Sequence, residues 1–282
     1  MVSEVIIADE EKYERIKGEI KKAGMKNFHV IADFDKTLTK VLVNGKTIPS
    51  IISLLRDNNY ISEEYSTKAK KLFAKYHPLE IDPSLSKEEK KKYMSSWWNE
   101  HFDLLIKSGL NKNHLEKIVE SEGILLREGV LDFLDYLNKN KIPLVIFSSS
   151  GIGDAIPMML EKYNKTSKNI FVVSNMYIWD KNGNAVGINQ PIIHSMNKDE
   201  TSLKEIKPVY EKIKDRKNVL LLGDSIGDIG MIEGFDYKNL LKVGFLNEEV
   251  EKNLNLYKEN FDIVITNDGD FDFVNDLVGE LK

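Results

Sequence analysis

The sequence lacks cysteine and long apolar runs, and each absence excludes a class of protein. With no cysteine among 282 residues, disulfide bonds and thiolate zinc sites are impossible, and we expect a reducing, cytoplasmic location. No apolar run approaches the roughly 20 residues of a membrane-spanning helix. Acidic residues from Glu4 onward argue against a signal peptide. We therefore expect no membrane partner.

The chain also lacks an excess of basic residues. Lys and Arg total 40 against 45 Asp and Glu, which gives a net charge of -5 with the two signs mixed. Such a chain has no basic stripe that could follow a phosphate backbone, so we expect no nucleic-acid polymer as a partner. Hydrophobic residues at 41% and charged residues at 30% are ordinary for a folded protein. We expect a monomer or a weak homo-oligomer.

Six short apolar runs, rich in β-branched residues, predict strands that are covered on both faces. Their apolar residues are continuous rather than alternating, which is typical of a parallel sheet. Helical spacing in residues 129–140 favours a repeating βα arrangement. The runs are residues 28–33, 142–148, 169–175, 218–224, 240–246 and 261–266. We predict an α/β fold with a Rossmann-like parallel sheet, in which ligands bind beyond the carboxyl ends of the strands.

About a hundred residues separate the first two runs, far more than a simple crossover needs. We interpret residues 45–124 as an inserted α-helical cap domain, and residues 1–44 and 125–282 as the catalytic core. Inside the cap, a helical stripe of residues at 65, 69, 72, 73 and 76 predicts a first helix, and two further helices are expected over residues 87–107 and 112–121.

Two local signals add detail to this outline. A capping box that starts at Ser86 precedes the longer cap helix. The pair Asn182-Gly183 predicts a small hairpin after the third apolar run.

Two aspartates, Asp33 and Asp35, follow the first run in the segment DFDKTLT. Alternation along an extended chain points both side chains the same way, and carboxylates that close repel each other unless a proton or a cation intervenes. Mg²⁺ prefers carboxylate oxygens, and Asp224 in LLGDSIGD supplies a third carboxylate at the end of another strand. The pattern favours a Mg²⁺ site. The alternative is that each aspartate caps a helix or turns a loop.

The segment FSSSGIGD, after the second run, fits phosphate binding. Ser148 ends the run, and its hydroxyl and the backbone N–H groups before a following helix can surround phosphate oxygens. Lys198 is a compact cation that could neutralise both a phosphate and a nucleophilic carboxylate. Alone, such a loop can be a simple turn and such a lysine a solvated surface residue.

Taken together, DFDKTLT, Ser148, Lys198 and GDSIGD resemble the four motifs of the haloacid dehalogenase superfamily of phosphatases, in the expected order. Further segments, among them EIDPSLSKEEK, LREG, IIHSMNK and LKVGFLN, are similar to the cytosolic pyrimidine 5'-nucleotidases of the type III group. The resemblance covers nearly the whole chain. It implies Mg²⁺-dependent hydrolysis of nucleoside 5'-monophosphates, with UMP and CMP favoured.

The resemblance implies a covalent mechanism for the aspartates. Asp33 would attack phosphorus and form an aspartyl-phosphate, which splits one difficult displacement into two. Asp35 would protonate the leaving oxygen and then activate a water. Asp33, Asp224 and the backbone carbonyl of Asp35 would hold Mg²⁺.

The same resemblance implies a role for the residues around the phosphate. Ser148, Ser149 and Lys198 would hold the other phosphate oxygens. Asp228 would orient Lys198 or a metal-bound water. FSSSGIGD is one residue longer than the usual FSAGIGD, so Ser149 could do the work given to Ser148.

The resemblance implies that residues of the cap recognise the base of the substrate. Glu80, in LEIDP, matches a carboxylate that reads the base, since it can accept hydrogen bonds from a ring N–H or an exocyclic amine; the alternative is a solvated loop residue. Trp97 and Trp98 either stack on the base or pack in the core. His101 stands where the family has a serine that helps to bind substrate.

Three alternatives remain open from the sequence. One is a relative that prefers 7-methylguanosine monophosphate, because a tryptophan could stack on a cationic purine. Another is a phosphatase for a small metabolite such as phosphoserine. A third, of a different class, is a non-catalytic nucleotide-binding protein; such a protein would have lost the nucleophile or a metal ligand, whereas this chain keeps Asp33 and Asp224.

Overall fold

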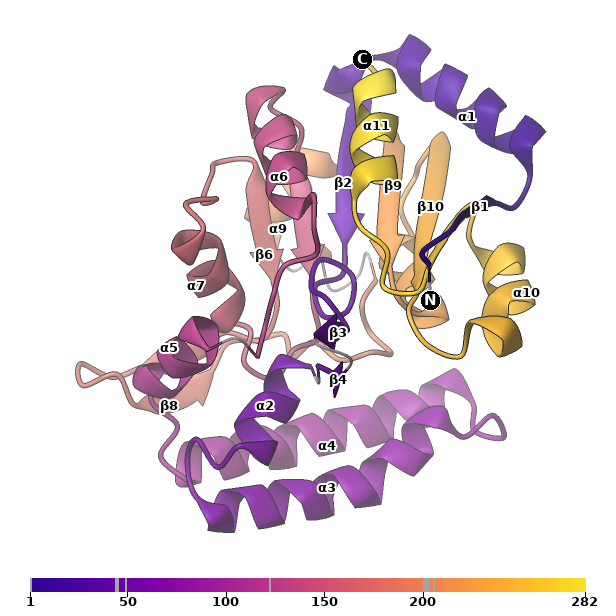
Figure 1. Cartoon of the computed structure of the whole chain (residues 1–282). Helices are drawn as coiled ribbons and strands as arrows, with labels where there is room; N and C mark the ends of the chain where they lie inside the picture. The colour runs from indigo at the N-terminus through magenta and orange to yellow at the C-terminus, as the bar shows by residue number, and fades with distance from the viewer. Residues whose placement is uncertain (1, 44–45, 49, 122, 200–202, 205) are drawn as a thin grey trace.

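The protein folds around a seven-stranded sheet with helices on both faces (Figure 1). The structure, a computed structural model, describes residues 2–43, 46–48, 50–121, 123–199, 203–204 and 206–282. The strand order is β1-β11-β10-β9-β2-β5-β6, and all neighbours are parallel except β1 and β11. The strands are β1 (Val5–Ile7), β2 (Phe28–Ala32), β5 (Leu144–Phe147), β6 (Ile170–Val173), β9 (Asn218–Gly223), β10 (Asn239–Leu246) and β11 (Ile263–Thr266). This confirms the predicted α/β fold.

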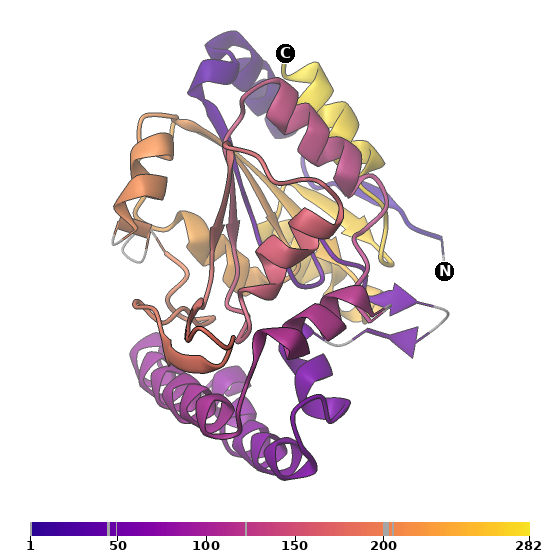
Figure 2. The same cartoon turned by 90° about the vertical axis from the view of Figure 1, so that its left-hand side faces the viewer.

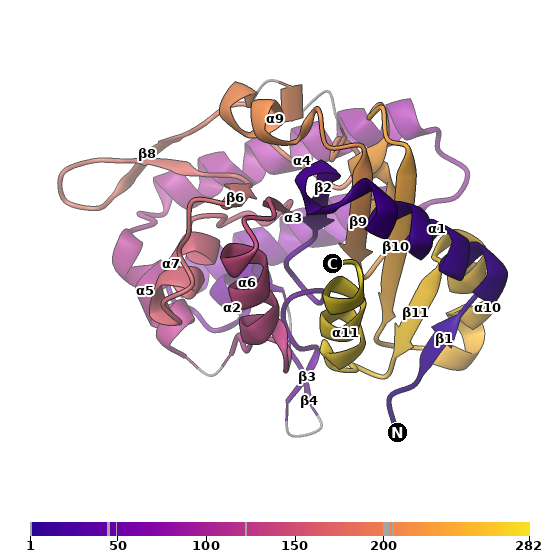
Figure 3. The same ribbon diagram turned by 90° about the horizontal axis from the view of Figure 1, so that it is seen from above.

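Both faces of the sheet are covered, as the continuous apolar runs predict. Every residue of β2 and β9 is buried, and alternate residues pack on opposite faces, with Val30 in one hydrophobic cluster and Ile31 in another. Figure 3 shows α6 and α11 on one side of the strands and α9 on the other. The helices of the core are α1 (Glu10–Ala23), η1 (Met25–Asn27), α6 (Val130–Lys139), α7 (Ala155–Lys162), α9 (Lys207–Ile213), η2 (Ile226–Ile232), α10 (Val250–Asn260) and α11 (Asp272–Glu280).

A helical insertion separates β2 from β5 and lies beyond the carboxyl ends of the strands (Figures 1 and 2). Its helices are α2 (Ile51–Asp57), α3 (Glu63–Ile81), α4 (Lys87–Lys107) and α5 (Lys112–Glu120). The three predicted cap helices are α3, α4 and α5, and the predicted capping box at Ser86 is present. The insertion is not wholly helical, because a short ribbon of β3 (Leu42–Val43) and β4 (Lys46–Thr47) precedes α2.

The expected boundary between residues 44 and 45 lies outside the described residues, so the division into core and cap stays a prediction. The segments that enter and leave the insertion pair with each other. The backbone N–H of Lys40 donates to the carbonyl of Leu125 at 2.8 Å, and Thr39 forms an isolated antiparallel β-bridge with Leu126. The chain therefore enters and leaves the insertion through paired segments.

The predicted hairpin is formed by β7 (Tyr177–Trp179) and β8 (Ala185–Ile188). Gly183 supplies the turn with a φ of 78°, in the left-handed region that glycine adopts without steric cost. The hairpin contacts the insertion, since the Asn111 side-chain amide donates to Asn184 Oδ1 at 2.8 Å. Among the helices of the described ranges, none combines the length and the apolar character of a membrane-spanning segment.

Candidate active site

Three aspartates converge at the carboxyl ends of two neighbouring strands. Asp33 follows β2, Asp224 follows β9, and Asp228 lies in η2. Because β2 and β9 pair in parallel register, their ends meet at the same edge of the sheet. One carboxylate oxygen from each residue lies within 4.8 Å of the others, and the cluster is largely buried.

Lys198 links two of these aspartates although it is remote from them in sequence. Its Nζ lies 2.6 Å from Asp33 Oδ1 and 2.8 Å from Asp228 Oδ1. Burial opposes the charge of this ammonium group, but attraction to Asp228 and Asp33 outweighs burial and raises the pKa of Lys198 above its ordinary value. Lys198 therefore stays charged and fixes the position of the Asp33 carboxylate.

Both oxygens of Asp228 accept hydrogen bonds within the protein. While Oδ1 accepts from Lys198, Oδ2 accepts from the backbone N–H groups of Asp224 and Ser225 at 3.2 and 3.0 Å, and from the Ser225 hydroxyl. Through these bonds the Asp228 carboxylate orients Lys198 and the backbone at Asp224 and Ser225. This geometry suits the orienting role predicted for Asp228 better than direct metal binding.

Asp33 and Asp224 have raised pKa values, and a bound cation would lower them by favouring the ionised carboxylates. Burial raises the pKa of Asp33 to about 7, where attraction to Lys198 opposes it and repulsion from Asp228 adds to it. Burial also raises the pKa of Asp224 well above its ordinary value, with repulsion from Asp228 and Asp33. Such buried, mutually repelling oxygen donors fit a hard divalent cation. The cluster is therefore consistent with a metal site, with Asp33 and Asp224 as its donors.

Asp35 lies beside this cluster and contacts the insertion. Its Oδ1 accepts a hydrogen bond from the backbone N–H of Ile51, at the start of α2, at 3.1 Å. Burial raises the pKa of Asp35 to about 6, and the Ile51 bond partly offsets the effect. A carboxyl group with this pKa can both donate and accept a proton near neutral pH.

The serine-rich loop after β5 faces the aspartates. Ser148, Ser149 and Ser150 all line the same cavity, and the Ser148 hydroxyl accepts from the backbone N–H of Ser150 at 3.1 Å. Ser149 is more exposed than the other two serines. Gly151 follows, and a side chain there would lie 2.5 Å from the Trp98 ring, so glycine allows Trp98 to pack against the loop.

These groups border one cavity of about 440 Å³ between the core and the insertion. The aspartates, Lys198 and the serine loop lie on the core side, and Glu80 and Trp98 come from α3 and α4. Its lining residues are Asp33, Asp35, Lys36, Ser50, Ile52, Glu80, Trp98, Ser148, Ser149, Ser150, Ser195, Lys198, Asp224, Ser225, Gly227 and Asp228. The structure thus brings most of the predicted site residues together.

The two tryptophans have different surroundings. Trp98 lines the cavity, whereas Trp97 stacks on Tyr76 of α3 with ring centroids 5.9 Å apart. His101 is buried behind Trp98, with ring planes 6° from parallel, and its Nε2 lies 3.0 Å from the Tyr65 hydroxyl. Neither Trp97 nor His101 is among the described residues that line the cavity. Direct contacts of these two side chains with substrate stay predictions.

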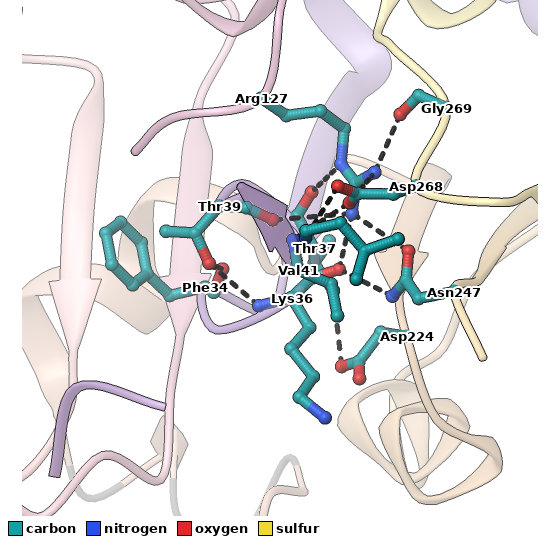
Figure 4. A network of polar contacts seen from close by, with 11 residues as sticks. Phe34, Lys36, Thr37, Thr39, Val41, Arg127, Asp224, Asn247, Asp268 and Gly269 are labelled. Atoms are coloured by element: carbon teal, nitrogen blue, oxygen red, sulfur yellow. Dashed lines mark hydrogen bonds and ion pairs between the residues drawn. The ribbon is translucent and has the colours of Figure 1, made fainter. Parts of the chain in front are cut away.

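Arg127, to which the sequence assigned no role, is fully buried and holds the segment after the predicted nucleophile (Figure 4). Its guanidinium donates to the carbonyls of Lys36 and Thr37 at 2.7 and 3.0 Å. It also pairs with Asp268 at 2.9 Å, and Asp268 accepts from the backbone N–H of Val41. In the sequence, Arg127 stands out only as part of LREG, one of the segments that are similar to the family.

Comparisons with known proteins agree on one family. The model of the family Pyrimidine 5'-nucleotidase (UMPH-1) matches residues 36–282. The human (Homo sapiens) 7-methylguanosine phosphate-specific 5'-nucleotidase is 35% identical over 279 residues, which cover 99% of this chain and 92% of that protein. The crystal structure of cytosolic 5'-nucleotidase IIIB bound to cytidine has a TM-score of 0.88 at 31% identity and covers 98% of this chain and 93% of that one.

A more distant structure supports the fold. A substrate-bound phosphoserine phosphatase is 19% identical with a TM-score of 0.51, over 90% of this chain and 97% of that one, so it shares the fold alone. The family model and the close relatives span nearly the whole chain. The chain therefore belongs to the pyrimidine 5'-nucleotidase (UMPH-1) family of haloacid dehalogenase-like hydrolases, and it is a 5'-nucleotidase.

Proposed function

We propose that this 5'-nucleotidase hydrolyses nucleoside 5'-monophosphates through a phosphorylated Asp33 and prefers 7-methylguanosine monophosphate. One observation carries the proposal: a single cavity has the aspartates and Lys198 on one side and Trp98 and Glu80 on the other. The first group suits a phosphate, and the second suits a base.

At the phosphate, Asp33 is the nucleophile. The oxygen of Asp33 that is not bound to Lys198 attacks phosphorus, and the bond from phosphorus to the 5'-oxygen breaks. Asp35 donates its proton to the leaving oxygen, and the nucleoside departs. Asp35 then takes a proton from a water, whose oxygen attacks phosphorus and displaces the Asp33 carboxylate to release phosphate. The raised pKa of Asp35, about 6, suits both steps.

Positive charge must offset the repulsion between a carboxylate and a phosphate dianion. Lys198 supplies one charge, and it reaches Asp33 while Asp228 holds it in place. Mg²⁺ held by Asp33 and Asp224 would supply further charge and polarise the phosphate. The hydroxyl and backbone N–H groups of Ser148, Ser149 and Ser150 complete the set of phosphate donors.

At the base, Trp98 and Glu80 favour a cationic ring. Methylation at N7 gives guanine a positive charge, which the face of an indole and a nearby carboxylate both attract. Glu80 can also accept hydrogen bonds from the ring N–H and the exocyclic amine of the same base. The names of the curated relatives, as 7-methylguanosine phosphate-specific enzymes, support this alternative better than the pyrimidine preference that the sequence favoured.

CMP is the second candidate substrate. The similar structure of cytosolic 5'-nucleotidase IIIB is bound to cytidine, and the exocyclic amine of cytosine could also donate to Glu80. We keep UMP as a weaker substrate because its base lacks that amine.

Trp98 argues against a phosphatase for small metabolites, because such a substrate has no base that could stack on an indole ring. The names of the relatives as cytosolic enzymes support a cytoplasmic location.

Initial phosphate-release rates on 7-methyl-GMP, GMP, CMP and UMP test the proposal. We expect kcat/KM to be highest on 7-methyl-GMP and at least tenfold lower on GMP, because about 1.4 kcal/mol of cation–π attraction is lost with the methyl group. Asp33→Asn should abolish release on all four while the protein still folds. Equal rates on GMP and 7-methyl-GMP would contradict the base assignment, and turnover by the Asp33→Asn variant would contradict the mechanism.

A further inference from the structure

Ser195 contacts Glu80 across the boundary between the core and the insertion. The Ser195 hydroxyl donates to Glu80 Oε1 at 2.6 Å, and His77 Nδ1 lies 3.3 Å from Oε2. Glu80 lies near the end of α3, whereas Ser195 lies in the loop after β8, 115 positions away. Both residues line the cavity, where the Glu80 side chain is 25% exposed. The carboxylate is therefore held from both sides and still accessible to a ligand.

The loop that carries Ser195 is fixed by its own hydrogen bonds. The backbone N–H of His194 donates to Asn197 Oδ1 at 2.7 Å, and that of Met196 donates to His194 Nδ1 at 3.2 Å. The Asn197 side chain also donates to the carbonyl of Ile192 at 2.8 Å. Lys198, which contacts Asp33, follows directly. Ser195 thus presents its hydroxyl from a loop whose geometry is set independently of Glu80.

Other polar contacts join the insertion to the same side of the core. Ser95 Oγ lies 3.1 Å from His194 Nε2, Lys91 lies 3.7 Å from Asp199, and Lys87 pairs with Glu233 at 2.5 Å. All three contacts come from α4, and none involves Ser195 or Glu80. Loss of the Ser195 hydroxyl would therefore remove the contact to Glu80 and leave these links in place.

We propose that Ser195 is a positioning residue that determines base specificity by fixing the Glu80 carboxylate. Each carboxylate oxygen can accept two hydrogen bonds, so Ser195 and His77 each occupy one position and leave one on each oxygen for the base. The two remaining acceptor positions, one on each oxygen of Glu80, suit a base with two adjacent hydrogen-bond donors or a cationic base. The proposal rests on the proposed function, since it needs Glu80 to face the base.

The test compares substrates with and without a base. For each variant, kcat/KM is measured on 7-methyl-GMP and on p-nitrophenyl phosphate, and the ratio of the two values is the readout. Ser195→Thr and Ser195→Val have the same shape and differ in the hydroxyl, so this pair decides the question even if Ser195→Ala were unstable. We expect the Val and Ala variants to lower the ratio roughly three- to tenfold, through a higher KM for 7-methyl-GMP, and Thr to restore it.

Ser96→Ala is the matched control, because Ser96 is an exposed serine on α4. It should leave the ratio at the wild-type value. If Ser195→Val and Ser195→Thr had the same ratio, whether high or low, the hydroxyl would have no role and the proposal would be wrong. A fall in kcat/KM on both substrates alike would indicate a structural role and overturn it as well.

Glu80→Gln separates failure of this proposal from failure of the proposed function. If Glu80→Gln leaves the ratio unchanged, Glu80 does not read the base and the proposed function is wrong at that point. If Glu80→Gln lowers the ratio and the Ser195 pair does not differ, only the role of Ser195 is wrong. In the expected case, Ser195→Val should add little in the Glu80→Gln background, since the two residues act through one contact.

Discussion

Arg127 holds the segment after Asp33 through hydrogen bonds to its backbone carbonyls. Lys36 has a φ of 61°, a left-handed conformation that costs about 1 kcal/mol for a residue with a side chain. The Lys36 carbonyl accepts from Arg127 at 2.7 Å and from the Asn247 side chain at 3.0 Å (Figure 4). These bonds hold the turn directly after Asp35, so they contribute to the position of the Asp35 side chain.

We expect Arg127→Lys to lower both stability and turnover. A lysine keeps the charge near Asp268 but cannot reach the carbonyls of Lys36 and Thr37 at the same time, because it lacks the planar fork of donors. The free energy of unfolding should fall by about 2–4 kcal/mol, since buried acceptors lose their partners. Urea unfolding measures the stability, and kcat on the preferred nucleotide measures the turnover.

Arg216→Lys is the control for this change. Arg216 also donates to backbone carbonyls, those of Met25 and Phe28, but it lies at the amino end of β2, away from the aspartates. The control should lose some stability and retain kcat. Equal losses of kcat in the two variants would show that Arg127 has no special role in holding the site.

Residues whose chemistry is local could be predicted from the sequence, and residues whose partners are distant could not. Asp33, Asp35 and Asp224 each stand at the end of an apolar run, so the topology of a parallel sheet predicts that they meet. Arg127 contacts residues about 90 and 140 positions away, and no local pattern indicates those partners. Ser195 was missed for the same reason.

At the scale of the element, β2 contains a buried titratable residue. His29 is 1% exposed, and burial lowers its pKa to about 3. The folded protein therefore keeps His29 neutral, whereas the unfolded chain binds a proton below the ordinary histidine pKa of about 6.5. Below this pH the unfolded state binds more protons than the folded state, so the free energy of unfolding falls as the pH falls from about 6.5 toward 3.

We expect His29→Gln to reduce this dependence on acid. Each such histidine contributes a slope of about 1.4 kcal/mol per pH unit within that window. Urea unfolding at pH 8, 7, 6 and 5 measures the slope for both proteins. Between pH 8 and 7 their difference should be constant, since the imidazole is neutral in both states, and this range is the internal control. Parallel curves down to pH 5 would mean that His29 is protonated in the folded protein.

Elements with their own strong pattern were predicted, and elements that depend on distant pairing were not. The strand β9 is a continuous apolar run, and α4 has its own capping box, so each is defined by local residues. By contrast, β1 has three partly exposed residues and exists because Val5 and its neighbours pair with β11 at the edge of the sheet. A run of three residues is too short to distinguish a strand from a loop by sequence.

At the scale of the whole molecule, the fold concentrates negative charge at one place. The parallel sheet brings the ends of β2 and β9 together, and the insertion lies over them, so water cannot fully screen the carboxylates (Figures 1 and 2). Burial and mutual repulsion raise the pKa values of Asp33 and Asp224, which is a cost to the folded state near neutral pH. A bound divalent cation removes that cost in the folded state and has no comparable site in the unfolded chain.

We therefore expect Mg²⁺ to raise the melting temperature of the protein and chelation by EDTA to reverse the change. At a concentration one hundred times Kd, a ligand that binds only the folded state stabilises it by about 2.7 kcal/mol. Asp224→Asn should lose most of the response, because it removes one of the two predicted carboxylate donors and leaves only Asp33 and the backbone carbonyl of Asp35. Asp272→Asn, on α11, changes the same kind of side chain at an exposed position outside the cavity and should keep the response.

The measurement is a thermal melt of the three proteins with Mg²⁺ or with EDTA. A wild-type melting temperature that does not respond to Mg²⁺, or an equal response in Asp224→Asn, would mean that this cluster does not bind the metal.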